Sequence, residues 1–442
     1  MHAPRNTEAM DEFTARVEAR TLTIAVVGLG YAGLPLAVSF AEAGFATVGV
    51  DVDLERCAAL NHGFSHVPDV PSERVAAVVV ANRFEAVAGI DDYPVADVVF
   101  VCVPTPFTGA PDLSYVQAAA RTVAENLQPG MLVVLQSTSY PGTTTEVVQP
   151  LLEQNGLIAG VDFWLAFSPE RVDPGNTTWD LHNTPKVVGG LTHGCTRRAC
   201  AILGAGLGAP GLVYPVSSPA IAEMTKLLEN TYRMVNIALV NELAMLAHEM
   251  DIDFEQVIAA AATKPFGFAS FRPGVGPGGE CIAVDPRILA WKAREGDLDV
   301  RLIDVADEVN RGMARHVVER IIEMLSRHGW GLADRRVLCL GVSYKAGVPD
   351  TRNSRALRVI ELLEQTGAIV EYADPLVSTV EVRGQERKAV NVAIDADLER
   401  FDVVVILVRG TWRLEKFLAR GVPIFDAAGT LVGVSAGSVD HL

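Results

Sequence analysis

One cysteine lies in a stretch whose residue types could support covalent chemistry. Residues 274–286 read GVGPGGECIAVDP, so Cys281 follows a series of glycines and a proline, and Asp285 comes four residues later. Glycine lets the backbone turn sharply and lets a ligand approach closely, so a thiol at this place could face a cleft and act as a nucleophile. Cysteine is also a common small hydrophobe of protein cores, and the pattern around Cys281 leaves both interpretations open.

A second set of residues could bind a dinucleotide. The motif GLGYAG (28–33) follows an apolar, strand-like run and precedes a helical pattern that extends to residue 43. Gly28 would make the tight turn, Gly30 would let the pyrophosphate approach, and Gly33 would let helix and strand pack closely. The phosphates would then face the helix N-terminus. The residues expected around them are Gly28, Gly30, Tyr31, Ala32 and Gly33.

An acid follows the next strand-like run at the spacing that such a site requires. Residues 46–50 are apolar and lead to Asp51, roughly twenty residues after the glycines. Its carboxylate would accept hydrogen bonds from ribose hydroxyls, which favours NAD over NADP. Arg56 could hold a 2′-phosphate, but Asp51 would repel that group. The complete unit predicts a Rossmann domain that binds NAD; a similar unit without a dinucleotide is the alternative.

Polar residues follow three further strand-like runs of the predicted parallel sheet. Thr105, Thr138 and Glu170 each come shortly after such a run. Ligands of doubly wound sheets bind beyond the carboxyl ends of the strands, which makes these three residues candidates for a binding site. Each residue alone could equally be a helix cap or a turn residue.

Chain length and the pattern of helix-like and strand-like runs divide the chain into several segments. It has 442 residues, of which 49% are hydrophobic, enough for more than one core. We expect a frayed extension (1–20), an NAD-binding Rossmann domain (21–214), a helical domain with a long helix and Cys281 (215–330), and a second Rossmann-like domain (331–442). The predicted fold class is α/β: two Rossmann-like doubly wound domains joined by a long central helix and a helical middle domain. A ligand would lie in the cleft between the two halves.

The long helix and the last segment carry further expectations. Lys226 and Asn230 share one face of the helical pattern 222–250, either as site residues or as part of a solvated polar stripe. Helical patterns resume at residue 287. The second α/β half lacks the G-x-G-x-x-G spacing, and its last strand is expected at 422–425.

Composition excludes several classes of partner. The net charge of −17 argues against nucleic acid and anionic membranes, because phosphates are held by a surplus of Lys and Arg. The six cysteines are scattered as in a reduced, cytoplasmic protein, with no secretory leader and no apolar run that could span a bilayer. His62 and His66 are four residues apart but lie in a Gly/Pro/Asp-rich stretch, so no metal site is predicted.

Five longer motifs together resemble the nucleotide-sugar 6-dehydrogenases, the family of UDP-glucose, UDP-N-acetylglucosamine and UDP-N-acetylmannosamine dehydrogenases. The resemblance extends from residue 21 to the C-terminus. The motifs are GLGYAGLPLA (28–37), SPERVDPGN (168–176), KLLENTYRMVNIALVNE (226–242), GGECIAVDP (278–286) and GVSYKAGVPDTRNS (341–354). Shorter runs are most similar to the UDP-N-acetylglucosamine branch; they are AATKPFGF (261–268), PVSS (215–218) and WKARE (291–295).

The resemblance implies a four-electron reaction. The C6 alcohol of a nucleotide-diphosphate hexose is oxidised to a carboxylate with two NAD⁺, through a thiohemiacetal and a thioester on Cys281. Lys226 and Asn230 are then expected to stabilise an oxyanion. The residues expected to hold or activate water or to relay protons are Thr138, Glu170 and Asp285.

The resemblance also implies binding contacts and an assembly. The long helix is similar to the family's dimer spine, so a homodimer or higher homo-oligomer is expected. Cofactor contacts beyond the glycine motif would come from Asp51, Arg56, Thr105, Thr138 and Arg352. Substrate contacts would come from Glu170, Arg171, Lys226, Asn230, Arg272, Gly278 and Lys345.

The sequence departs from the family pattern beside the thiol. The residue before the cysteine is usually His or Ser, and here it is Glu280. A carboxylate close to a thiol disfavours the thiolate. By the resemblance Glu280 would also lie near the sugar, so the choice between a UDP-N-acetylglucosamine-type sugar and glucose on UDP or TDP stays open. Two rival functions are a two-electron hydroxyacid-type dehydrogenase, which needs no thiol, and an inactive nucleotide-sugar-binding paralogue.

Overall fold

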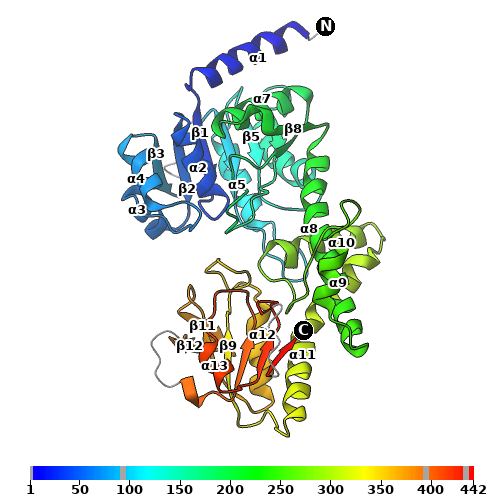
Figure 1. Ribbon diagram of the computed structural model, residues 1–442. Coiled ribbons are helices and arrows are strands. Elements are labelled where there is room, and N and C mark those ends of the chain that lie inside the picture. Colours follow the sequence, from blue (N-terminus) through cyan, green and yellow to red (C-terminus); the bar gives the residue numbers. More distant parts are fainter. Residues whose placement is uncertain (1–2, 90–95, 392–397, 432–437) are drawn as a thin grey trace. The chain divides into compact units, whose positions relative to one another are not determined.

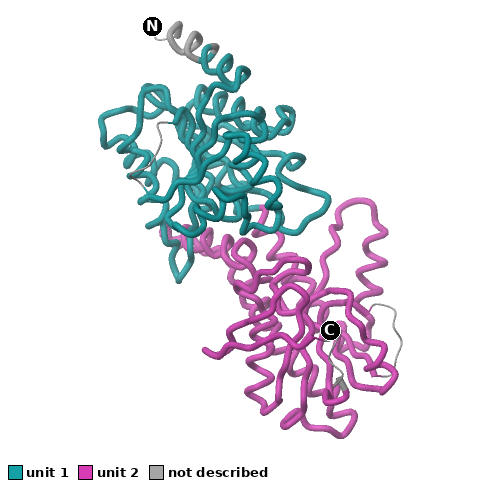
Figure 2. Tube along the Cα trace, turned by 90° about the vertical axis from the view of Figure 1, so that its left-hand side faces the viewer, with its two compact units in different colours: residues 1–228 teal, residues 229–442 magenta. Residues whose placement is uncertain are grey.

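The chain divides into two compact units, residues 1–228 and 229–442, which Figure 2 shows in different colours. The computed structural model describes residues 3–89, 96–391, 398–431 and 438–442. Each unit contains a sheet of mainly parallel strands with helices on both faces (Figure 1). The helix α8 (Pro219–Glu249) begins in the first unit and continues into the second. The α/β class with two Rossmann-like sheets and a helical middle part is confirmed.

The first unit has an eight-stranded sheet in the order β3-β2-β1-β4-β5-β6-β7-β8. All neighbours are parallel except β6 and β7, which pair antiparallel over a short stretch. The strands are β1 (Thr23–Val27), β2 (Ala46–Asp51), β3 (Phe84–Ala88), β4 (Val98–Val101), β5 (Leu132–Leu135), β6 (Trp164–Phe167), β7 (Lys186–Gly190) and β8 (Val213–Val216). The helices before α8 are α1 (Ala3–Glu18), α2 (Gly33–Glu42), α3 (Leu54–Asn61), α4 (Ser72–Val80), α5 (Ser114–Glu125), α6 (Gln149–Leu152) and α7 (His193–Gly206), with a π-helical turn at Thr144–Val148.

Alternation of side chains along the strands gives this sheet two buried faces. Val26 and Phe100 belong to one core, which α2, α3, α4 and α7 cover, whereas Val27 and Val101 belong to the other, which α5 and α6 cover. Successive side chains of a strand point to opposite faces, so a sheet covered on both sides needs continuous apolar strands. The strand-like runs expected before Gly28, Asp51, Thr105, Thr138 and Glu170 all form strands, namely β1, β2, β4, β5 and β6.

The expectation of a frayed N-terminal extension is wrong for the residues that the structure describes. Residues 3–18 form α1, and Met10, Phe13 and Val17 are buried in the core of the first unit. These residues are spaced by three and four, so they lie on one helical face. Arg198 of α7 is fully buried between the rings of Phe13 and Trp164, which lie 5.8 Å and 3.7 Å from its guanidinium carbon.

The start of α8 is tied to the loop that follows β5. Glu223 has no exposed surface, and its carboxylate accepts hydrogen bonds from the backbone N–H groups of Gly142 (2.6 Å) and Thr144 (2.9 Å). Burial raises the pKa of Glu223, while these donors favour its charged form. This contact fixes the first turns of α8 against the segment that follows Thr138.

The second unit has a five-stranded parallel sheet in the order β10-β9-β13-β14-β15 and a separate β11–β12 hairpin. Helices α11 and α12 cover one face of the sheet, and α13 covers the other. The strands are β9 (Arg336–Leu340), β10 (Ile369–Ala373), β11 (Thr379–Val382), β12 (Gln385–Lys388), β13 (Val403–Ile406), β14 (Ile424–Asp426) and β15 (Val439–His441). The helices after α8 are α9 (Phe254–Ala261), α10 (Cys281–Glu295), α11 (Arg301–Arg327), α12 (Arg355–Gln365) and α13 (Glu415–Ala419).

Two expectations for the second unit need correction. The strand expected to be last is followed by β15, which pairs with β14 through Phe425 and Asp440. The helical pattern expected from residue 287 begins earlier, because Cys281 is already the first residue of α10 and Pro286 lies inside the helix. Apolar residues of α8, α10 and α11 form a small core that supports this helix; they are Met234, Ala238, Ala290, Ile303 and Ala306.

Candidate active site

The glycine motif of the first unit has the geometry that a dinucleotide needs. Gly28 has φ +91°, and a Cβ there would come within 2.7 Å of the Cys102 carbonyl oxygen. A Cβ on Gly33 would lie 1.8 Å from the Gly28 carbonyl oxygen, so only glycine lets α2 pack this closely. A Cβ on Gly30 would meet no atom within 4 Å, which leaves open space for a pyrophosphate at the start of α2. Exposed Tyr31 and partly buried Ala32 complete the turn.

Asp51 at the end of β2 holds this turn in place. Its Oδ2 accepts from the Leu29 N–H at 2.8 Å and from Arg56 Nη1 at 2.9 Å, and the carboxylate is almost fully buried. Arg56 is therefore oriented by the same carboxylate that would repel a 2′-phosphate. The arrangement fits the ribose of NAD better than that of NADP.

Polar side chains from neighbouring strand ends contact one another in the first unit. The Thr105 hydroxyl donates to the Thr138 carbonyl oxygen at 2.6 Å, which joins the segments that follow β4 and β5. Gln136 donates to Glu170 Oε2 at 3.0 Å, which joins the ends of β5 and β6. The structure thus brings Thr105 close to Thr138. Glu170 is linked to the end of β5 through Gln136, a residue that the sequence analysis did not single out.

Glu170 is held by four donors. Its Oε2 accepts from Lys186 Nζ at 2.7 Å as well as from Gln136, and its Oε1 accepts from the backbone N–H groups of Arg171 (2.7 Å) and Val172 (2.9 Å). Burial alone would raise the pKa of Glu170, but the Lys186 charge and these hydrogen bonds more than offset it, so the pKa is lowered. A carboxylate held ionised in this way is suited to fixing a neighbour rather than to exchanging protons.

Sequence reasoning missed Gln136 and Lys186. Lys186 is the first residue of β7 and is 1% exposed. The sequence feature that could have identified it is a charged residue at the start of an otherwise apolar run, KVVGG. Two further candidates of this unit are Arg171, whose backbone N–H binds Glu170, and Lys226. Partly buried Arg171 donates to the Pro185 carbonyl oxygen at 2.6 Å, and Lys226 is buried in α8.

The second unit holds the thiol and a buried polar pair. Cys281 is exposed, whereas four of the other cysteines are buried and Cys200 is partly buried. Asp285 is one helical turn along α10 from Cys281, and its Oδ2 accepts from Asn230 Nδ2 of α8 at 2.6 Å. Asp285 and Asn230 are each 5% exposed, so this hydrogen bond is shielded from water. Burial raises the pKa of other thiols, namely Cys57, Cys102, Cys200 and Cys339.

The turn before Cys281 passes very close to the segment that follows β9. A Cβ on Gly278 would lie 2.8 Å from both Tyr344 Cβ and the Asn353 carbonyl oxygen, and Gly279 has φ +73°. The Gly279 N–H donates to the Arg352 carbonyl oxygen at 2.9 Å, and Asn353 Nδ2 donates to the Gly279 carbonyl oxygen at 3.0 Å. The structure therefore brings Gly278 and Arg352 together with the thiol-bearing turn. Arg272 lies in an exposed loop and pairs with Glu255.

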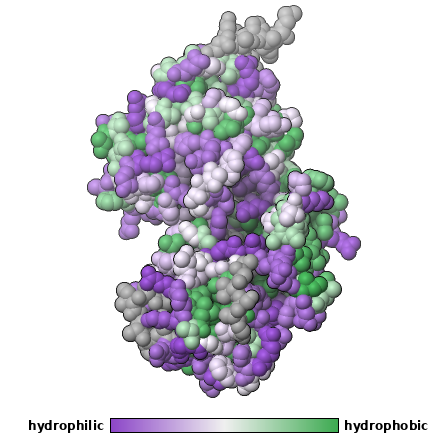
Figure 3. All heavy atoms as spheres, in the orientation of Figure 1, coloured by the Kyte–Doolittle hydropathy of each residue, from purple (hydrophilic) through white to green (hydrophobic). Residues whose placement is uncertain are grey.

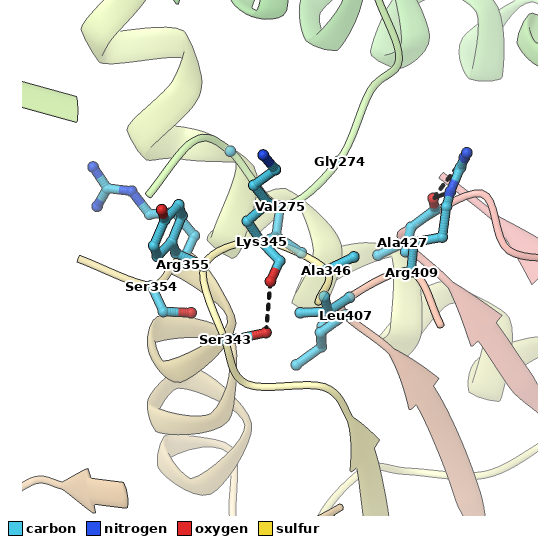
Figure 4. A pocket seen from close by; sticks show the side chains of 14 residues that line it. Gly274, Val275, Ser343, Lys345, Ala346, Ser354, Arg355, Leu407, Arg409 and Ala427 are labelled. Carbon is cyan, nitrogen blue, oxygen red and sulfur yellow. Dashed lines mark hydrogen bonds between the residues drawn. The ribbon is translucent and has the colours of Figure 1, made fainter. Parts of the chain in front are cut away.

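A cavity of about 190 Å³ opens at the carboxyl ends of β9 and β13 (Figure 4). Its cationic lining residues are Lys345, Arg355 and Arg409, from three separate segments of the second unit. Ser354, which precedes α12, also lines it, and its hydroxyl is buried without a hydrogen-bond partner. A helix N-terminus beside three cations favours an anionic ligand.

Within the part of the chain that the structure describes, no group of His, Cys, Asp or Glu side chains is arranged to hold a metal ion. Within the same part, every helix is too short or too polar to cross a membrane.

Three family models match consecutive parts of the chain, all described as parts of the UDP-glucose/GDP-mannose dehydrogenase family. They are the NAD binding domain (22–203), the central domain (220–312) and the UDP binding domain (338–421). The chain is 36% identical to a UDP-N-acetyl-D-mannosamine dehydrogenase from Pyrococcus horikoshii over 80% of this chain and 84% of the relative. It is 35% identical to a UDP-N-acetyl-D-glucosamine 6-dehydrogenase from Pseudomonas aeruginosa over 81% and 84%. A solved structure of the Pyrococcus horikoshii UDP-D-ManNAc dehydrogenase superposes with a TM-score of 0.86, at 32% identity, over 95% of this chain and 99% of that one.

Replacing single glycines separates folding from cofactor binding. We expect Gly30→Ala to melt within about 2 °C of wild type, because its Cβ meets no atom, but to bind NAD⁺ at least about tenfold more weakly. Gly33→Ala is the matched control and should lose the folded first unit, because its Cβ would overlap the Gly28 carbonyl oxygen. Calorimetric titration with NAD⁺ and thermal melts supply both measurements. Unchanged NAD⁺ affinity in Gly30→Ala would place the pyrophosphate elsewhere.

The Glu170–Lys186 pair makes the stability of the first unit depend on pH. Because the pKa of Glu170 is lowered in the folded state, its contribution is present above its unfolded pKa and is lost as the pH falls through the folded pKa. Lys186→Met removes one partner of a largely buried pair and should cost about 3 kcal/mol at pH 7. The double variant Lys186→Met/Glu170→Gln should recover part of this loss and show less acid sensitivity. Thermal melts between pH 3 and pH 8 test this; equal melting of Lys186→Met and wild type at pH 7 would contradict it.

Proposed function

This chain belongs to the UDP-glucose/GDP-mannose dehydrogenase family and is an NAD-dependent oxidoreductase, and we propose that it oxidises the C6 hydroxymethyl group of a UDP-linked hexose to a carboxylate. The observation that carries this proposal is the exposed thiol of Cys281 at the first position of α10, one turn from the buried Asp285–Asn230 pair. The relatives' names favour a UDP-N-acetylhexosamine as the first substrate to test, with UDP- and TDP-glucose for comparison.

The cofactor site belongs to the first unit. Gly28, Gly30 and Gly33 would hold the pyrophosphate of NAD, and Asp51 would bind the adenosine ribose. Thr105 and Thr138, already joined by a hydrogen bond, lie at neighbouring strand ends of the same sheet. Bound NAD⁺ supplies the electron acceptor for the oxidation, two molecules for each alcohol carried to the acid.

Cys281 would act as the nucleophile at the aldehyde stage. Its sulfur bonds to C6, and the proton of the thiol ends on the aldehyde oxygen, which gives a thiohemiacetal with a hydroxyl on the carbon still to be oxidised. Once this carbon reaches the thioester level, a water oxygen bonds to C6 and the C–S bond breaks. Cys281 leaves as a thiol and the sugar as a carboxylate.

Neighbouring polar residues would manage charge and protons. Asp285 would accept the proton of the thiol or of the attacking water, and its bond to Asn230 fixes the carboxylate toward α8. An amide nitrogen carries two N–H groups, so Asn230 can orient Asp285 with one and stabilise an oxyanion with the other. Lys226 is proposed for the same oxyanion. The locked, ionised Glu170 would position water with Thr138 rather than transfer protons.

The nucleotide would bind in the cavity of the second unit. Lys345, Arg355 and Arg409 line it and offer positive charge to a diphosphate, as a UDP binding domain requires. We propose that residues 21–214 bind NAD, 215–330 carry the thiol and 331–442 bind the nucleotide. A cytoplasmic location stays a prediction from the scattered cysteines.

The exposed face of α8 in the second unit supports a homodimer. Hydrophobic side chains recur there at helical spacing, and Figure 3 shows hydrophobic surface where Figure 1 places α8 and α9. The stripe consists of Tyr232, Leu239, Leu243, Leu246 and Met250, each at least 40% exposed. A continuous apolar stripe of this kind favours a self-complementary helix contact between two copies.

Counting NADH per sugar tests the proposed reaction. We expect two NADH for each UDP-N-acetylglucosamine consumed and a uronic acid product. Cys281→Ser should reduce steady-state acid formation by at least about a hundredfold, because serine is a far poorer nucleophile at neutral pH. Cys200→Ser, which removes a partly buried thiol, is the control and should retain wild-type turnover. One NADH per sugar would indicate a two-electron enzyme, and none a binding protein.

Charge introduced into the α8 stripe should separate the subunits. Leu243→Asp/Leu246→Asp places two carboxylates in the proposed contact and should weaken association by roughly a hundredfold or more, since each buried leucine contributes about 2 kcal/mol. Val80→Asp, at an 82% exposed position of α4, is the control and should leave the mass unchanged. Light scattering during size-exclusion chromatography gives the masses. A monomeric wild type would overturn the homodimer, and a variant mass equal to a dimeric wild type would place the contact elsewhere.

A further inference from the structure

An acidic residue directly precedes the thiol, and it is paired with an arginine from another segment of the second unit. Glu280 Oε2 lies 2.6 Å from Arg352 Nη1. Arg352 is itself held by Asp350, whose Oδ1 accepts from Arg352 Nε at 3.1 Å and whose Oδ2 accepts from Nε at 2.9 Å and from Nη2 at 2.6 Å. Asp350 is 8% exposed, so a buried carboxylate fixes the Arg352 guanidinium independently of Glu280.

Stability does not explain the Glu280–Arg352 contact. The side chains of Glu280 and Arg352 are 58% and 46% exposed, and exposed ion pairs contribute little to folding. Two hydrogen bonds already hold the turn against the 350–353 segment: the Gly279 N–H donates to the Arg352 carbonyl oxygen, and the Asn353 side-chain amide donates to the Gly279 carbonyl oxygen. The effect of the pair is therefore on the charge next to Cys281 and not on folding stability.

The charges around Cys281 oppose one another. The N-terminus of α10 favours a thiolate on its first residue, whereas the adjacent carboxylate of Glu280 and that of Asp285 one turn on disfavour it. Arg352 is the cation that the structure pairs with Glu280, the acid directly before the thiol in the chain. Without it, Glu280 and Asp350 would stand as two uncompensated negative charges beside the thiol-bearing turn.

We propose that Arg352 is a positioning residue that holds and neutralises the Glu280 carboxylate, so that Cys281 stays reactive beside an acidic neighbour. The proposal rests on the nucleophilic role given to Cys281 above. An unpaired acid directly before Cys281 would disfavour the thiolate and slow the reaction. Paired with Arg352, Glu280 forms a neutral unit, which explains how an acid can occupy this position. Arg352 would perform this task whether or not it also contacts the cofactor.

Alkylation of Cys281 in the full-length protein tests the proposal without substrate. Iodoacetamide forms an S–C bond with the thiolate and releases iodide, so its rate reports the thiolate fraction. The rate would be followed by mass spectrometry of the peptide that contains Cys281, between pH 6 and pH 10. The variants are Arg352→Met, Glu280→Gln and the double variant, with Arg352→Lys as the conservative change.

We expect Arg352→Met to be alkylated about threefold to tenfold more slowly at pH 7, with its pH midpoint displaced upward and its limiting rate at pH 10 unchanged. The double variant should be alkylated clearly faster than Arg352→Met, because the carboxylate directly before the thiol is then removed and only Asp350 is left without its guanidinium partner. Glu280→Gln alone should be as fast as wild type or faster. Arg352→Lys should lie between wild type and Arg352→Met, since lysine keeps the charge but cannot bond both carboxylates as a planar fork.

Several results would overturn the proposal. Equal pH midpoints in wild type and Arg352→Met would show that Arg352 does not control the thiol. A double variant as slow as Arg352→Met, or a lower limiting rate at pH 10, would show that the turn had lost its shape and not its charge balance. The outcome is separable from the proposed function: if Cys281→Ser retained full turnover, the catalytic role would fail while the alkylation results still stood.

Discussion

The thiol stands where it does because two glycines let the backbone pass against the segment that follows β9. A side chain on Gly278 or Gly279 would overlap Tyr344, and the chain could not then enter α10 at Cys281. This close approach also lets the Gly279 N–H donate to the Arg352 carbonyl oxygen and lets the Gly279 carbonyl oxygen accept from the Asn353 side-chain amide. One close contact thus joins the start of α10 to the sheet that carries the cationic cavity, and it leaves Cys281 exposed while Asp285 is buried.

Two carboxylates at strand ends of the first unit are each held by several hydrogen-bond donors. Asp51 binds the glycine turn through the Leu29 N–H, and Glu170 takes four donors, among them Lys186. A buried ion pair contributes little net stability, but it allows few alternative arrangements of the groups involved. The strand ends of this sheet therefore present a fixed polar edge, which suits binding and orientation better than proton exchange.

Local patterns were predictable, and contacts between distant segments were not. The glycine motif and Asp51 follow from spacing alone, because the whole unit lies within one strand–turn–helix–strand segment. The Glu170–Lys186 pair was missed because it depends on β7 running antiparallel to β6, which no local pattern indicates. The α1 helix could have been recognised from Met10, Phe13 and Val17, whose spacing is helical. The Glu280–Arg352 contact joins residues far apart in the chain, so the sequence showed only an acid in an unusual place.

The most direct test of the central claim is the mass of the Cys281 peptide during turnover. Wild type and Asp285→Asn, in which thioester hydrolysis should be slowed, would be mixed with UDP-N-acetylglucosamine and NAD⁺ and quenched in acid at successive times. We expect a nucleotide-sugar acyl group on Cys281, on no other cysteine, and in larger amount in Asp285→Asn. Release of two NADH per sugar while Cys281 stays unmodified at every time in both proteins would contradict covalent catalysis by this thiol.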